Sequence, residues 1–144
     1  VDVFGDGPQR AHLQSRIEQL GLADTIRLRG RVDRAQLRSE YQHADLFLST
    51  TALEAFGIAG LEARTAGLPV VARRGTGMAD FVTDGVNGRL ADADGLADAL
   101  VELVVDDALR QAMSQVNRVT APTQSWPLVV ESTLAEYRRA GATS

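Results

Sequence analysis

EAFGIAGLEA, residues 54–63, lies between two apolar runs, DLFLS at 45–49 and PVVA at 69–72. Apolar residues recur at helical spacing after Gly57, so we predict a helix over residues 57–66. Gly67 supplies the positive φ that commonly ends a helix, and Pro69 blocks its continuation. The flanking runs have the continuous apolar centre of strands that are buried on both faces. This stretch is therefore predicted to form a strand–loop–helix–strand unit.

Gly57 lies at the amino-terminal end of the predicted helix, which we call its mouth. The first N–H groups of a helix have no intrahelical acceptor, and the helix dipole adds partial positive charge there, so such a mouth suits an anion. Glu54 precedes the helix, and Glu62 lies roughly 7–8 Å further along its axis. The spacing alone leaves two interpretations open: a solvated pair beside an ordinary helix, or a pair flanking a sugar–diphosphate–ribose ligand.

The longer run EAFGIAGLEARTAGLPVVA, residues 54–72, resembles the donor-binding signature of the retaining glycosyltransferases of the GT-B fold, family 4 or group 1. That signature has two glutamates separated by seven residues, an aromatic–glycine pair after the first glutamate, and A-x-G-x-P-V-V after the second. The resemblance implies a hexosyltransferase-type enzyme with an NDP-sugar donor. It implies Glu62 as the ribose anchor, Glu54 as the catalytic residue beside the transferred sugar, and donor contacts at Phe56, Gly57 and Ile58.

Two segments near the amino terminus match the same family. The sequence GDGP, residues 5–8, resembles the element that follows the family's second strand, which implies that Gly5 approaches the ligand; plain turn chemistry is the alternative. The sequence GRV, residues 30–32, resembles a G-x-V loop that touches the nucleotide base, which implies contacts at Arg31 and Val32. The alternative is that Val32 only packs before Asp33, the cap of a helix over residues 34–43.

The segment RRGTG, residues 73–77, follows a predicted strand, at the edge where open α/β sheets bind ligands. Gly75 and Gly77 correspond to a Gly-Gly pair of the family, here separated by Thr76. Either Arg73 or Arg74 could meet a phosphate, and a solvated charge pair is the alternative. The following DFVTDGVNGRL, residues 80–90, resembles the family's E-x-V-x-D-G-x-N-G-x-L with aspartate in place of the first glutamate.

The remaining pattern predicts an α/β fold: a Rossmann-like parallel sheet flanked by helices, forming half of a GT-B fold. Further strands are predicted at 1–4, 25–29 and 89–91. A helix is predicted over 8–20 with Leu13, Ile17 and Leu20 inward, and three helices after residue 95, the last capped by Ser125. The predicted catalytic residue is Glu54. The predicted donor-binding residues are Glu62, Phe56, Gly57, Ile58, Gly5, Arg31, Val32, Gly75 and Gly77.

The family's first donor-domain strand, with its phosphate-binding Arg and Lys, has no counterpart in the sequence, and neither does its amino-terminal acceptor domain. We therefore expect one domain over residues 1–144 that is truncated at its amino terminus. In the family the first strand lies between those matching residues 1–4 and 45–49. Both runs are apolar, so the sequence predicts a break in the sheet between them, a direct closure, or a strand lent by another chain.

Composition argues against several classes of partner and cofactor. Net charge is −4 and the estimated pI is about 5.1, which argues against nucleic acid as a surface-wide partner. Cysteine is absent and no His/Asp/Glu cluster has metal-ligand spacing, so we expect no metal and no cofactor beyond the NDP-sugar as co-substrate. No apolar run reaches membrane-spanning length. We expect a cytoplasmic protein, or one at the inner face of a membrane if the missing acceptor domain takes a lipid.

Two other functions stay open at this point. One is a different GT-B enzyme, such as a nucleotide-sugar epimerase or a phosphorylase. The other is a non-catalytic module that binds nucleotide-sugars. Nucleotide-sugar turnover separates an enzyme from a module, and product analysis separates transfer from epimerisation.

Overall fold

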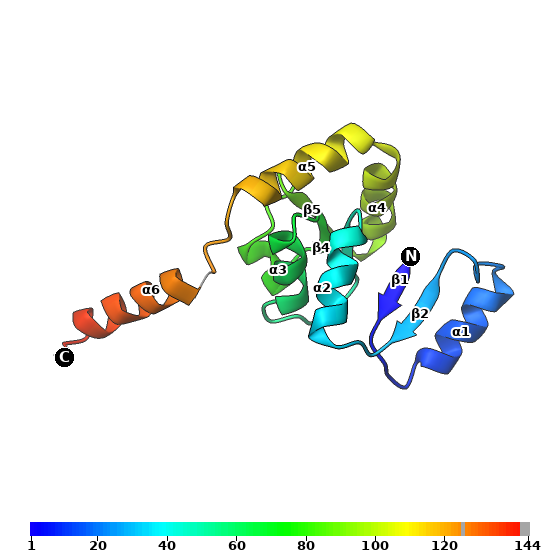
Figure 1. The fold of residues 1–144 in the computed structure, drawn as a ribbon, viewed down its shortest axis with the longest axis horizontal. Helices are drawn as coiled ribbons and strands as arrows, with labels where there is room; N and C mark the ends of the chain where they lie inside the picture. Colours follow the sequence, from blue (N-terminus) through cyan, green and yellow to red (C-terminus); the bar gives the residue numbers. More distant parts are fainter. Residues whose placement is uncertain (125, 142–144) are drawn as a thin grey trace. The chain divides into compact units, whose positions relative to one another are not determined.

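The computed structural model describes residues 1–124 and 126–141, without the side chain of residue 126. Its contacts divide the chain into two compact units, Val1–Gln42 (unit 1) and the part from His43 onward (unit 2). Strands alternate with helices or a short 3-10 turn as far as Ala91, and every strand pairing is parallel (Figure 1). Parallel pairing with helical crossovers is the arrangement that the alternation of the sequence predicts.

Unit 1 contains a two-stranded sheet of β1 (Asp2–Phe4) and β2 (Arg27–Gly30), in which Val3 lies opposite Leu28. The helix α1 (Arg10–Gln19) connects these strands, and α2 (Arg34–His43) follows β2.

Asp33 caps α2 as predicted. Its carboxylate accepts from the Gln36 N–H at 2.8 Å, and the Gln36 side chain accepts from the Asp33 N–H at 3.1 Å. This reciprocal pair satisfies two main-chain donors at the start of the helix.

The prediction for the inward face of α1 is wrong in part. Ile17 is buried, but Leu13 is 45% exposed and Leu20 is 52% exposed. A two-stranded sheet offers less apolar surface than a wide sheet, so it does not cover a full helical face. The strand predicted from Thr25 begins instead at Arg27, because Thr25 and Ile26 close the turn that follows α1 through bonds to Leu22.

Unit 2 contains a three-stranded sheet in the order β3 (Phe47–Ser49), β4 (Val70–Arg73), β5 (Gly88–Ala91). The helix α3 (Ile58–Thr65) connects the first two strands, as predicted. After β5 come α4 (Leu96–Val105), α5 (Asp107–Val119) and α6 (Trp126–Arg139); two short 3-10 turns lie at Gly77–Asp80 and Ala93–Gly95. The predicted cap of the last helix, Ser125, lies outside the described residues.

The sheet of unit 2 has an apolar cluster on each face. Alternate residues of β4 point to opposite sides, so Val70 and Ala72 belong to one cluster and Val71 to the other. The first cluster includes Phe81 and packs against Leu61 of α3; the second includes Leu103 of α4 and Met113 of α5. A strand that is buried on both faces explains the continuous apolar run at residues 69–72.

A buried polar group joins the helices of unit 2. The Asn117 amide of α5 donates to the main-chain oxygens of Leu68 at 2.8 Å and Asn87 at 2.9 Å. Its oxygen accepts from Arg64 Nε at 3.2 Å. Arg64 is 7% exposed, and burial lowers its pKa below the ordinary value. The Asn117 side chain therefore links three segments: α3, the loop after it and the turn before β5.

Of the three outcomes predicted for the strands at 1–4 and 45–49, direct pairing of one with the other is excluded. Among the described residues, β1 pairs with β2 alone and β3 pairs with β4 alone, so residues 1–4 and 45–49 belong to separate sheets.

Candidate functional site

The mouth of α3 requires a glycine. Gly57 has φ +86°, and a Cβ on it would lie 2.6 Å from Met78 Cγ. The first intrahelical bond runs from Leu61 N–H to Gly57 O at 3.0 Å, so the N–H groups before Leu61 precede the helical ladder. Ile58, the first helical residue, is 62% exposed. Met78 thus packs over buried Gly57, and Ile58 is the exposed residue at the start of the helix.

Glu54 lies on this mouth. Its Oε1 accepts from the N–H of Gly57 at 3.0 Å and from the N–H of Phe56 at 3.3 Å. Gly57 has no side chain that could cap the helix, and the Glu54 carboxylate performs that role. The main chain here thus binds a carboxylate through two N–H groups, which is the chemistry an anion site needs.

Phe56 contributes its main chain to the mouth and its ring to the core. The ring meets Phe81 edge to face, with centroids 5.8 Å apart. It also packs against the apolar cluster that contains Val70 and Ala72. This packing holds the loop before α3 on the sheet, which fixes the direction of its N–H groups.

Glu62 lies on α3 and is half-buried. In the part of the chain that the structure describes, no hydrogen bond or ion pair joins its carboxylate to another group. Glu54 and Glu62 therefore differ: the first carboxylate is engaged with its own loop, and the second is available to a ligand.

The structure brings Gly75 and Gly77 to the same edge. Gly77 N–H donates to Glu54 O at 2.9 Å, and a Cβ on Gly77 would lie 2.0 Å from Ala55 O. Thr76 Oγ1 donates to Arg73 O at 2.8 Å and closes the turn, while a Cβ on Gly75 would meet nothing within 4 Å. The loops that follow β3 and β4 thus touch through their main chains.

The two arginines of this loop have different surroundings. Arg74 donates to Leu90 O and pairs with Asp84 at 3.4 Å, so its guanidinium is engaged along β5. Arg73 is half-buried, and its guanidinium has no hydrogen bond or ion pair with any described residue. Arg73 is therefore the better candidate for a phosphate contact.

The predicted site residues of unit 1 form a group of their own. Gly5 follows β1 and Gly30 ends β2, and the Gly5 N–H donates to Gly30 O at 2.8 Å. Gly5 has φ +121° and open space around it, Arg31 is exposed and Val32 is half-buried. Since carboxyl ends of parallel strands share one edge, these residues gather where an α/β sheet binds ligands.

These observations agree with one family. The model of "Glycosyl transferases group 1" matches residues 1–119. The chain belongs to this family. Its fold class, parallel sheets flanked by helices as in the carboxyl-terminal half of GT-B enzymes, is confirmed.

Named relatives of this group 1 chain are glycosyltransferases. The D-inositol 3-phosphate glycosyltransferase of Paenarthrobacter aurescens (strain TC1) is 34% identical over 93% of the chain and 34% of the relative. The crystal structure of TarM superposes with a TM-score of 0.80, at 26% identity over 93% of the chain and 28% of TarM. Anabaena Alr3699/HepE in complex with UDP-glucose gives 0.76, at 28% identity over 96% and 40%. The chain spans about a third of the length of the curated relatives it matches.

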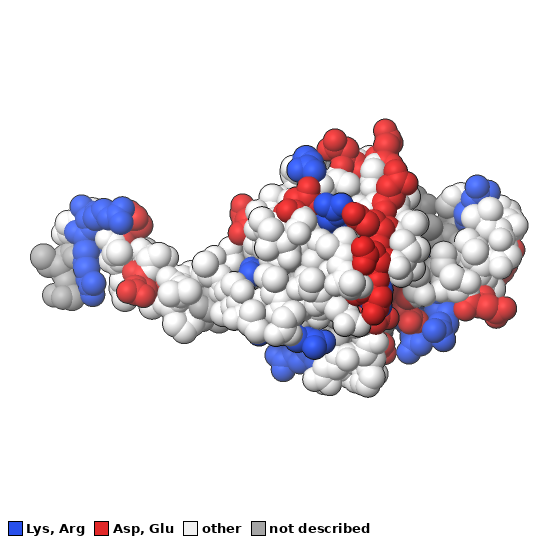
Figure 2. Space-filling view, turned by 90° about the horizontal axis from the view of Figure 1, so that it is seen from above, with Lys and Arg blue, Asp and Glu red and all other residues white. Residues whose placement is uncertain are grey.

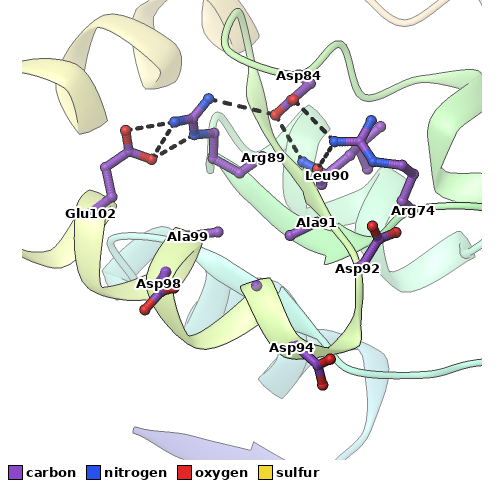
Figure 3. Close-up of a pocket in the computed structure, with 11 residues that line it drawn as sticks. Arg74, Asp84, Arg89, Leu90, Ala91, Asp92, Asp94, Asp98, Ala99 and Glu102 are labelled. Carbon is purple, nitrogen blue, oxygen red and sulfur yellow. Dashed lines mark hydrogen bonds and ion pairs between the residues drawn. The ribbon is translucent and has the colours of Figure 1, made fainter.

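One hollow of the chain is lined by none of the residues at the mouth of α3. Its volume is about 810 Å³, and its lining includes Arg74 and Arg89 together with the acidic residues Asp84, Asp92, Asp94, Asp98 and Glu102 (Figure 3). Figure 2 likewise shows a band of acidic side chains across one face. Five carboxylates outnumber the two arginines in this hollow and would repel a diphosphate, so the mouth of α3 is the better candidate for a donor site.

Among the described residues, 1–124 and 126–141, no three His, Asp or Glu side chains are placed to hold a metal ion. No helix there has the length and apolar character that crossing a membrane requires.

Sequence reasoning missed Met78, Asp84 and Asn117. Met78 fills the space over Gly57 and Gly60, Asp84 accepts from Leu90 N–H at 3.0 Å, and Asn117 joins three segments. Of these three, only Asp84 could have been noticed in the sequence, because Asp84-Gly85 is a pair typical of turns.

Proposed function

We propose that this chain is the donor-binding half of a retaining glycosyltransferase. It takes an NDP-sugar, and the sugar passes to an acceptor held by a separate amino-terminal domain. The observation that carries the proposal is the mouth of α3, where the main chain of Phe56 and Gly57 binds the carboxylate of Glu54 and where Glu62 has a carboxylate available on the same helix. The UDP-glucose named for Alr3699/HepE supports a nucleotide-sugar of this kind.

Each predicted residue then has a role. Glu62 accepts hydrogen bonds from the ribose hydroxyls. Glu54, with the main chain of Phe56, Gly57 and Ile58 beside it, faces the sugar and the phosphate. Gly5, Arg31 and Val32 serve the nucleotide through their main chains. Gly75 leaves open space for close main-chain approach of the sugar, and Gly77 lets the loop after β4 pack against Ala55 beside it.

The chemistry follows from charge. A leaving nucleotide diphosphate gains negative charge in the transition state, and the positive end of α3 together with Arg73 stabilises it. The sugar carbon gains positive charge at the same time, and the negative carboxylate of Glu54 stabilises that side. Because both effects grow as the bond breaks, they raise the rate more than they raise donor affinity.

The first experiment is a calorimetric titration of the purified protein with UDP and with GDP. Glu62→Ala removes charge-assisted hydrogen bonds to ribose, which is worth about 1–3 kcal/mol, so the affinity should fall by about 5- to 150-fold. The matched control is Glu131→Ala, which removes an exposed glutamate of α6 and should leave the affinity unchanged. Equal affinity for Glu62→Ala and the unaltered protein would refute the ribose contact.

The second experiment separates binding from chemistry at Glu54. Glu54→Gln keeps an oxygen that can accept from Phe56 and Gly57 N–H, so the loop keeps its bonds while the charge is lost. In the complete enzyme, with its amino-terminal domain, turnover of the NDP-sugar should fall more than nucleotide affinity. The anomeric configuration of the product, read by NMR, tests retention. A parallel loss of affinity and turnover would count against a transition-state role.

A further inference from the structure

The outer edge of β5 is closed by side chains. Since β5 is the last strand in its sheet, one of its edges has no neighbouring strand. Successive residues of a parallel strand direct their main-chain groups to opposite edges. Arg74 N–H donates to Ala91 O at 2.8 Å, which places the groups of Ala91 toward β4 and those of Leu90 toward the outer edge.

Every outward group from Gly88 O to Leu90 O has a partner. Gly85 N–H donates to Gly88 O at 2.9 Å. Asp84 Oδ1 accepts from Leu90 N–H at 3.0 Å, and Arg74 donates to Leu90 O. Figure 3 shows Arg74 and Asp84 pointing toward each other and toward Leu90. The two side chains thus replace a neighbouring strand, which protects an edge that would otherwise pair with another chain.

The same ion pair reaches α4. Arg89 pairs with Asp84 at 3.7 Å and makes two hydrogen bonds of 2.6 Å to Glu102. The hydrogen bond to Glu102 is the main reason why the pKa of Arg89 lies above its ordinary value, so this guanidinium remains charged. Asp84 is therefore held between two arginines, Arg74 and Arg89.

Arg74 also begins the loop of the candidate donor site. Three residues later, Gly77 donates to Glu54 O and packs against Ala55 with no room for a Cβ. Arg74 is fixed at both its N–H and its guanidinium, so this end of the loop cannot shift without breaking bonds to β5. The position of Glu54 and the mouth of α3 thus depends, through one short loop, on the closed edge of β5.

We propose that Arg74 and Asp84 act together as positioning residues: they close the edge of β5 and thereby hold residues 74–77 against the loop that carries Glu54. This inference rests on the proposed function for its effect on donor binding. It assigns Arg74 to the scaffold and leaves the phosphate contact to Arg73.

The test uses Arg74→Ala, Asp84→Ala and the double variant, with UDP and GDP as probes. If the pair acts as one unit, each single variant weakens nucleotide affinity by about 5- to 10-fold, and the double variant is no worse than either. If Arg74 instead contacts a phosphate, Asp84→Ala leaves the affinity unchanged or raises it, since removing a negative charge favours an anionic ligand. That second pattern would overturn the proposal.

Two further variants separate the hydrogen bond of Asp84 to Leu90 from the effect of its negative charge. Asp84→Asn keeps an oxygen for Leu90 N–H and loses the charge, so it should retain most of the affinity that Asp84→Ala loses. Asp107→Ala breaks a different Arg–Asp pair, with Arg110 on α5, and should leave the affinity unchanged. Failure of Asp84→Asn to restore affinity, or a matching loss in Asp107→Ala, would show that the specific bond to Leu90 does not matter.

Amide hydrogen exchange by NMR tests the positioning without any ligand. The amides of Leu90 and Gly77 should exchange at least 10-fold faster in both single variants, whereas the amide of Leu103 in α4 should not change. Unaltered exchange at Gly77 would refute the link between edge and loop. If neither UDP nor GDP binds the unaltered protein, the proposed function fails, and this exchange pattern still decides whether the pair positions the loop.

Discussion

Units 1 and 2 follow the same alternation of strand and helix and differ in how they are held. The buried apolar side chains of unit 1 are Ile17 and Tyr41. Unit 2 has an apolar cluster on each face of its sheet, with Leu103 and Val71 fully buried. Burial of a large apolar side chain contributes about 1.5–3 kcal/mol. The apolar core therefore contributes much more to the stability of unit 2 than to that of unit 1.

Unit 1 relies more on polar contacts at its surface. Asp2 pairs with Arg27 at 3.4 Å and with Arg29 at 3.5 Å, and Arg29 pairs with Glu40 at 3.7 Å. Exposed ion pairs of this kind contribute about 0–1 kcal/mol each. The same local pattern thus gives a small apolar core on two paired strands and a larger one on three. We expect unit 1 to open at a lower free energy than unit 2.

The largest difference should come from removing one leucine in each unit. Leu103→Ala leaves a cavity at a fully buried position and should cost about 3–5 kcal/mol of unfolding free energy. Leu13→Ala, on the half-exposed face of α1, should cost less than about 1 kcal/mol. Urea unfolding followed by circular dichroism measures both. Similar losses in the two variants would remove the distinction between the units.

Asn117→Ala tests the buried polar group of unit 2. The substitution leaves the oxygens of Leu68 and Asn87 and the Nε of Arg64 without this partner, and should cost about 3 kcal/mol. Gln115→Ala, an exposed position of the same helix, is the control and should be near neutral. If thermal and urea unfolding place both variants within about 0.5 kcal/mol of each other, the group does not hold unit 2 together.

Two glycines, one in each unit, should respond with opposite signs. Gly77→Ala forces a methyl group against Ala55 O, a main-chain atom that cannot yield, and should cost about 2 kcal/mol and weaken nucleotide affinity. Gly7 has open space and no left-handed φ, so Gly7→Ala should stabilise by up to about 1 kcal/mol. A neutral Gly77→Ala would mean that the two loops move apart easily.

The smallest effect belongs to the cap of α2. Asp33→Ala removes the bond to Gln36 N–H and should cost about 1 kcal/mol. Asp33→Asn keeps an accepting oxygen and should restore most of that loss. Hydrogen exchange should show the loss at the first turn of α2 while amides of β4 in unit 2 keep their protection. Equal acceleration in both units would mean that they unfold as one.

Local features were predictable because neighbouring residues decide them. Gly57 and Gly67 bracket α3 as expected, since a left-handed φ at each position favours glycine over other residues. Asp33 caps α2 because its partner Gln36 is only three positions away. The family resemblance pointed to the loops after β3 and β4, and the structure joins them through the Gly77 N–H and Glu54 O.

Contacts between distant residues were not predictable from the pattern. Arg64 and Asn117 are 53 positions apart, and nothing local indicates that the two side chains meet. Helical spacing predicted that Leu13 points inward, but it could not show how little sheet α1 has to pack on, and Leu13 is 45% exposed. The engagement of Glu54 with its own loop was also missed, because a glutamate before a helix reads equally well as a ligand contact.

The turn before β5 has a consequence for the chemical ageing of the protein. Asn-Gly sequences deamidate readily, because the glycine nitrogen attacks the asparagine side-chain carbonyl and forms a succinimide. Asn87 precedes Gly88, but it is 4% exposed; its oxygen accepts from Thr83 N–H at 2.7 Å and its amide donates to Phe81 O at 3.1 Å. These bonds keep the side-chain carbonyl from turning toward the Gly88 nitrogen. Slow conversion of Asn87 to aspartate or isoaspartate in stored protein would therefore report how often this turn opens.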